Sequence, residues 1–112
     1  MPNNTNNAIL ANEGVVPITI DFNGLNEGSQ SFSDSVEMIM RALTGGYNIP
    51  INLRGTQAQL SSFINSIKKE HDYFKSIKRY GPNDPQAQAD RYNLEKAIRE
   101  FERKNGIPWP MK

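Results

Sequence analysis

Side chains able to carry out covalent or metal chemistry are scarce in this sequence. Its 112 residues include one histidine and no cysteine, and they contain no GxxxxGK[ST], GxGxxG or HExxH motif. Most phosphate-loop, nucleophile and thiolate-metal templates are therefore excluded. The lone His71 lies at helical spacing from neighbouring apolar residues, so we expect a core or boundary histidine and not a metal ligand. The sequence predicts a protein that is not an enzyme, with no catalytic residue, metal or cofactor.

A candidate anion site lies where two predicted strands end. Arg54, Gly55 and Thr56 close the second strand and start a helix, while Asp21 and Asn23 close the first. Open α/β sheets place ligands at such carboxyl ends, and a helix start offers N–H groups to an anion. The simpler interpretation, a solvated arginine followed by a helix cap, is favoured because no glycine-rich loop lets a phosphate approach closely.

The densest basic stretch runs from residue 68 to residue 80, where cations alternate with aromatic rings. Such cations could contact phosphates while a tyrosine stacks on a base. A helix spreads them, however, and Asp72 lies in the row that contains Lys75 and Arg79. A solvated helix face is therefore favoured over a nucleic-acid surface. The candidate partner-binding residues of this stretch are Lys68, Lys75, Lys78, Arg79 and Tyr80.

Trp109 is the remaining candidate partner-binding residue. Prolines flank it on both sides, so it has few conformations to lose on docking. It could stay exposed and enter a partner's pocket, as aromatic hot spots do, or fold back as a clasp near Tyr80 and Phe101. The clasp is favoured because Ile107 is placed for the hydrophobic contact that accompanies a helix-ending glycine, here Gly106.

Two strands and a short helix must position the candidate anion site. Apolar and polar residues alternate in segments 15–22 and 47–54, which predicts strands with one buried face each. Each segment has a proline on its polar set, which suits an edge strand. Segment 34–43 has apolar residues at helical spacing, so the order predicts a parallel β-α-β unit. The predicted buried residues are Val16, Ile18, Ile20, Phe22, Val36, Ile39, Met40, Leu43, Tyr47, Ile49, Ile51 and Leu53.

Two longer helices carry the basic stretch and the tryptophan tail. Thr56 can cap a helix over 56–80 that stops at Gly81, and Asp84 can cap a helix over 85–105 that stops at Gly106. Because the joining loop is short, we expect an antiparallel helical hairpin that packs on the β-α-β unit. The fold class is therefore α+β, or small α/β, with one globular domain over 15–112. The predicted apolar stripes are Leu60, Phe63, Ile64, Ile67, Phe74 and Ile77, then Leu94, Ala97, Ile98 and Phe101.

The composition limits the partners and the compartment. Thirteen basic and twelve acidic residues give a net charge of +1, so no global field attracts nucleic acid or anionic membrane. Residues 1–14 are rich in asparagine and poor in apolar groups, which predicts a flexible arm that orders on a partner. The chain has no apolar run long enough to span a membrane and no secretory signal in residues 1–14. We therefore expect a cytoplasmic protein, or a component of a virion, with no membrane partner.

A resemblance adds to this interpretation. The YGPNDP turn and the ending FERKNGIPWPMK look like those of small uncharacterised phage-encoded proteins. The resemblance implies an accessory or virion role and carries over no functional residue. The leading hypothesis is a non-catalytic interaction or assembly protein that binds a protein partner or forms a homo-oligomer. The alternatives are a nucleic-acid-binding accessory protein that uses the 68–80 face, and a small enzyme or ligand binder at the strand ends.

Overall fold

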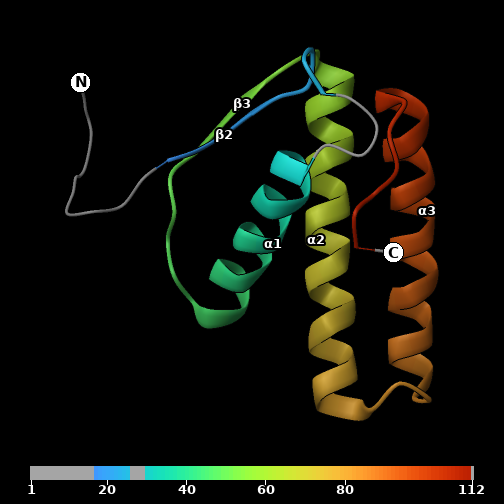
Figure 1. The fold of residues 1–112 in the computed structure, drawn as a ribbon. Coiled ribbons are helices and arrows are strands. Elements are labelled where there is room, and N and C mark those ends of the chain that lie inside the picture. The colour runs from blue at the N-terminus through green and yellow to red at the C-terminus, as the bar shows by residue number, and fades with distance from the viewer. Residues whose placement is uncertain (1–16, 26–29, 112) are drawn as a thin grey trace.

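The fold combines three helices with one pair of parallel strands. The computed structural model describes residues 17–25 and 30–111, so the predicted arm over 1–14 lies outside the described residues. The elements follow the order β2 (Ile18–Asp21), α1 (Gln30–Gly45), β3 (Ile51–Arg54), α2 (Gln57–Tyr80) and α3 (Pro85–Asn105). In Figure 1, α2 lies between α1 and α3, and the strand pair meets the bundle near the start of α2. The predicted mixture of helix and strand is confirmed, and helix predominates.

The two strands form a parallel pair four residues long. Ile18 aligns with Ile51 and Asp21 with Arg54. The Ile18 N–H donates to the Pro50 carbonyl over 2.9 Å, and the Phe22 N–H donates to the Arg54 carbonyl over 2.8 Å. Proline has no N–H and can only accept at this point, so β3 begins at the residue after Pro50. The strand predicted over 47–54 is therefore shorter than expected.

The strand β3 lies at the margin of the core. On β2, Ile18 and Ile20 are buried, but Tyr47 is 72% exposed and Ile51 is 41% exposed. The predicted buried face of segment 47–54 is therefore wrong for these two residues, although Leu53 is half-buried. Alternation in a strand determines which way a side chain points and says nothing about whether another layer covers it. Here α1 packs on β2, which leaves β3 as the outer strand.

The helix α1 starts earlier than the predicted segment 34–43. Ser31, Ser33 and Asp34, whose residue types favour helix N-caps, lie inside it. The Ser35 hydroxyl donates to the Ser31 carbonyl over 2.9 Å, a bond one helical turn back that lets serine occupy a helix. The stripe is confirmed at Val36, Ile39 and Met40, which are buried, whereas Leu43 is exposed.

Local sequence signals determine the start of α2 and both ends of α3. The Thr56 hydroxyl accepts from the Gln59 N–H, and the Gln59 side chain accepts from the Thr56 N–H in return, which makes a capping box. The Asp84 carboxylate caps α3, with Pro85 in its first turn. Gly106 ends α3 in the left-handed conformation at φ 72°, which glycine adopts without steric cost. The helices predicted over 56–80 and 85–105 therefore form with nearly the expected bounds.

Serine hydroxyls join α2 to α3. The Ser66 hydroxyl donates to the Ala97 carbonyl over 3.1 Å, and the Asn105 amide donates to the Ser62 hydroxyl over 3.2 Å. The Ser76 hydroxyl bonds the Asp90 carboxylate nearer the connecting loop. These contacts pair the start of α2 with the end of α3, and the two helices lie side by side in Figure 1.

Five aromatic rings form the centre of the core. Phe22 follows β2, Phe32 belongs to α1, Phe63 to α2 and Phe101 to α3, and Trp109 comes from the tail. Ring centroids in this aromatic cluster lie 5.0 to 6.3 Å apart, in edge, tilted and stacked arrangements. The residue after β2, each of the three helices and the tail thus contribute one ring each to the aromatic cluster. The predicted stripe of α2 is wrong at two positions, because Ile64 and Phe74 are exposed.

Truncation of a ring in the aromatic cluster should lower the free energy of unfolding substantially. We expect Phe63→Ala or Phe101→Ala to cost about 3–5 kcal/mol, the usual range for deletion of a buried aromatic side chain. Urea denaturation measures this change, with Tyr92→Ala as the control because Tyr92 is an exposed aromatic residue on α3. Midpoints equal to wild type for the two phenylalanine variants would contradict this account of the core.

Candidate functional site

The C-terminal tail packs through Trp109 against α2 and the C-terminal part of α3. Its indole is 1% exposed and lies edge-on to Phe101, with ring centroids 5.0 Å apart. The indole N–H donates to Glu70 Oε1 over 3.0 Å, and the backbone N–H donates to Glu102 Oε2 over 2.8 Å. Trp109 is therefore a clasp, and the alternative of an exposed binding anchor is wrong. Tyr80 takes no part in the clasp, because it lies at the loop end of α2.

The end of α3 directs this tail. The Gly106 N–H donates to the Glu102 carbonyl over 2.9 Å, and the left-handed backbone turns the chain back. Ile107 then becomes buried, as expected for the residue after a helix-ending glycine. Figure 1 shows the tail returning along the helix pair. This path places Trp109 against α2 and Met111 at the edge of a groove.

Glu70, which accepts the indole N–H of Trp109, has a partly buried carboxyl group. It lies three residues after Ile67 and four before Phe74, so it shares the side of α2 on which Ile67 packs. Burial raises the pKa of its carboxyl group, and the hydrogen bond from Trp109 opposes this by favouring the charged form. The Glu70 carboxyl group is therefore a half-buried acid held between the clasp and the groove.

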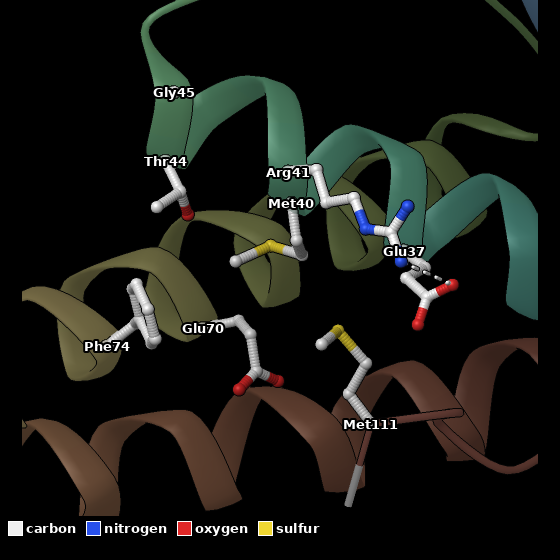
Figure 2. A pocket seen from close by; sticks show the side chains of 8 residues that line it. All are labelled: Glu37, Met40, Arg41, Thr44, Gly45, Glu70, Phe74 and Met111. Atoms are coloured by element: carbon white, nitrogen blue, oxygen red, sulfur yellow. Dashed lines mark ion pairs between the residues drawn. The ribbon is translucent and has the colours of Figure 1, made fainter.

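The groove lies between α1, α2 and the tail and has a volume of about 390 Å³. Figure 2 shows the Glu70 side chain extending from α2 between Phe74 and Met111, with Met40 of α1 opposite. Phe74 and Met111 are each 41% exposed. The lining residues are Glu37, Met40, Arg41, Thr44, Gly45, Glu70, Phe74 and Met111. This groove therefore combines apolar side chains with a surface ion pair and one further carboxylate.

The two oxygens of the Glu70 carboxylate have different surroundings. Oε1 accepts from the Trp109 indole, whereas Oε2 makes no hydrogen bond or ion pair within residues 17–25 and 30–111. Asn105 Oδ1 is the single fully buried side-chain oxygen without a partner in that part of the chain. Glu70 Oε2 must therefore be accessible to solvent, and the groove is where Glu70 meets solvent.

The candidate anion site is largely occupied by its own helix cap. Gln59 uses the Thr56 hydroxyl and the Thr56 N–H, so these groups are engaged without a ligand. A Cβ at Gly55 would lie 2.7 Å from Gln59 Oε1 and 3.1 Å from Phe22 Cβ. Gly55 is therefore needed for close packing of the chain itself. Arg54 is exposed, and the Asp21 carboxylate accepts from the Asn23 N–H in its own turn.

The basic stretch does not form one continuous patch. Lys75, Arg79 and Tyr80 line a second pocket of about 420 Å³ together with Asp72 and Asp90, whose charges offset theirs. Lys68 and Lys78 do not line this pocket. The Lys78 ammonium lies 5.6 Å from the centre of the Phe74 ring, and Lys68 is exposed earlier on α2. His71 is half-buried, as expected for a boundary residue.

The groove was not predicted from the sequence, although one signal was present. Glu70 interrupts an apolar stripe on α2, and glutamate is almost never fully buried unless it is paired. A carboxylate in step with Ile67 therefore signals a specific partner. The partner, Trp109, lies 39 residues further along the chain, and periodicity within one helix cannot reveal it.

The described residues hold neither a metal-binding cluster nor a membrane-spanning helix. Across residues 17–25 and 30–111, no group of three or more His, Asp or Glu side chains is arranged to hold a metal ion. None of the helices there combines the length and the apolar character that a membrane span requires.

The clasp should control the fluorescence of the protein, because Trp109 is its single tryptophan. We expect a blue-shifted emission that acrylamide quenches poorly and that shifts to red when urea unfolds the chain. N-acetyltryptophanamide in the same buffer provides the fully exposed reference. Red-shifted, freely quenched emission from the folded protein would contradict the clasp.

Glu70 should make the free energy of unfolding fall as the pH rises. Because its folded pKa exceeds the unfolded value, the folded chain retains a proton that the unfolded chain has lost. The resulting stabilisation is present below the ordinary pKa of glutamate and is lost as the pH rises through the folded pKa. Glu70→Gln removes this dependence and still accepts the indole N–H. As the pH rises from the ordinary pKa of glutamate through the folded pKa of Glu70, we expect the free energy of unfolding of wild type to fall relative to that of Glu70→Gln. Urea denaturation at a series of pH values measures this difference.

Glu100→Gln is the matched control for that pH series. The hydrogen bond from Arg103 lowers the pKa of the exposed Glu100 carboxyl group. Its stabilisation is present above the ordinary pKa and is lost as the pH falls, so wild type should gain stability relative to Glu100→Gln as the pH rises. The two variants should thus show opposite signs. The same sign for both would contradict the environment described for Glu70.

No family model, curated protein or solved structure matches this chain.

Proposed function

We propose that this protein is a non-catalytic interaction module that binds a protein partner through the groove between α1, α2 and the tail. The observation that carries the proposal is the exposure of Phe74 and Met111 on either side of a half-buried carboxylate. Single exposed apolar side chains are common, but a hollow that combines several of them with a polar group is typical of a binding site.

The lining of the groove suits a protein surface. Met40 and Met111 have flexible, polarisable side chains that adapt to the shape of a bound segment. Glu37 and Arg41 form an ion pair over 3.7 Å at the α1 side and supply a polar rim. An apolar centre with a polar rim is the usual anatomy of protein interfaces.

Nucleic-acid binding through the 68–80 face remains the second hypothesis. Asp72 and Asp90 share the second pocket with Lys75 and Arg79, which reduces the local positive potential. A ligand site or small enzyme at the strand ends ranks third, because Gln59 already uses the polar groups of Thr56. Both alternatives therefore have less support than the groove.

The resemblance to small phage-encoded proteins suggests a setting for the proposed binding. A structural or host-modulating role in a phage, in the cytoplasm or in a virion, would require protein contacts of this kind. A second copy of the chain is one such partner, and light scattering of the purified protein tests it. A dimer that Met111→Asp converts to a monomer would identify the groove as a self-association surface.

Selection of peptides from a random display library tests the binding role directly, because the selection requires no named partner. We expect the selected peptides to bind the groove, so that Phe74→Asp or Met111→Asp weakens binding by more than about tenfold, as at interface hot spots. Isothermal titration calorimetry with the synthetic peptides measures the change. Both residues are exposed, so the substitutions should leave the fold intact.

Tyr92→Asp is the matched control, since it places the same charge at an exposed aromatic residue of α3. It should leave peptide binding unchanged. Selected peptides that respond to Tyr92→Asp and ignore Phe74→Asp would contradict the groove as the binding surface.

A further inference from the structure

The groove has an unbalanced negative charge. Glu37 and Arg41 neutralise each other across 3.7 Å, so Glu70 remains as the uncompensated charge among the lining residues. No described cation lies within ion-pair distance of it. The Lys78 ammonium lies 5.6 Å from the centre of the Phe74 ring, is exposed and does not line the groove, so solvent and salt screen its charge from Glu70.

The walls around this charge are apolar. Met40, Phe74 and Met111 surround the Glu70 side chain, and the carboxylate keeps Oε2 accessible (Figure 2). A ligand that matches both features has an alkyl stem and a cationic end. Arginine meets this description, because its guanidinium is weakly hydrated and pairs well with a partly buried carboxylate.

We infer that the groove binds an arginine side chain of a protein partner, with the guanidinium on Glu70 Oε2 and the alkyl stem against Met40, Phe74 and Met111. The inference rests on the proposed function and names the chemistry that the same groove recognises. Its volume of about 390 Å³ lies at the small end of the usual range for ligand sites and suits one long side chain.

Arginine binding leaves the clasp in place. Oε1 keeps the bond from the Trp109 indole over 3.0 Å while Oε2 takes the guanidinium. Both bonds are made by the same carboxylate. Binding of a guanidinium at Oε2 therefore changes the chemical environment of the indole N–H. Trp109 is the single tryptophan, so its indole N–H gives one resolved signal in a nitrogen–proton NMR spectrum.

The test uses the full chain and a set of capped pentapeptides, Ac-Ala-Leu-Xaa-Leu-Ala-NH2, where Xaa is arginine, lysine, citrulline or glutamate. Citrulline has nearly the shape of arginine but no charge. We expect the arginine peptide to shift the Trp109 indole signal saturably, with a Kd of about 1 mM for so short a ligand. The citrulline peptide should bind at least about tenfold more weakly, in line with the strength of charge-assisted hydrogen bonds.

Two variants test the same point from the protein side. Glu70→Gln keeps an acceptor for the indole and removes the charge, so it should reduce arginine-peptide affinity to that of the citrulline peptide. Glu95→Gln removes one negative charge from an exposed position on α3 and should leave the affinity unchanged. The citrulline comparison changes the ligand alone, so it decides the matter even if a variant folds poorly.

Several results would overturn the inference. Equal affinity for the arginine and citrulline peptides would show that the carboxylate plays no part, and no saturable shift with any peptide would show that the groove does not bind an arginine. Butylguanidinium that binds as tightly as the arginine peptide would identify a small organic cation as the ligand instead of a protein segment.

The display selection separates this inference from the proposed function. Selected peptides that bind the groove without arginine would overturn the inference and leave the proposed function standing. Peptides that bind elsewhere would overturn the proposed function itself.

Discussion

The aromatic cluster is the constraint on which the rest of the structure depends. Its five rings come from the segment after β2, from each of the three helices and from the tail, and no single segment contributes two of them. A chain with 37% apolar residues has limited material for a core, and large rings bury the most surface per residue. The positions of β2, the three helices and the tail are therefore tied to one cluster. The tail belongs to the core as much as the helices do.

This arrangement explains why a carboxylate lies at the edge of an apolar site. Burial of Trp109 in the cluster removes its indole N–H from water, and that group needs an acceptor. Glu70 supplies one oxygen and Glu102 takes the backbone N–H, so the two long helices hold the tail between them. The cost is partial burial of the Glu70 charge. A structural requirement of the core thus creates the feature that gives the groove its chemical character.

The sequence predicted those parts of the fold that local signals determine. Thr56, Asp84 and Gly106 act on the backbone within a few residues, and the helix bounds near them are as expected. The long helix stripes identified Phe63 and Phe101 as core residues for the same reason.

Predictions that depended on distant segments were less successful. Exposure of Tyr47, Ile51 and Phe74 depends on which layer covers them, and periodicity within one element carries no such information. The groove needs α1, α2 and Met111 together, and the role of Glu70 needs a contact across 39 residues. The candidate site was therefore predictable only in the tendency of Trp109 to fold back.

The outer strand gives the molecule two levels of cooperativity. β3 supplies backbone hydrogen bonds but little buried side-chain surface, since none of its four residues is fully buried. Resistance to local opening follows the apolar surface that an element buries. β3 therefore separates from β2 at a free energy below that of global unfolding, and its amide hydrogens exchange with solvent through this opening. Amides at the centres of α2 and α3 exchange only when the aromatic cluster itself comes apart.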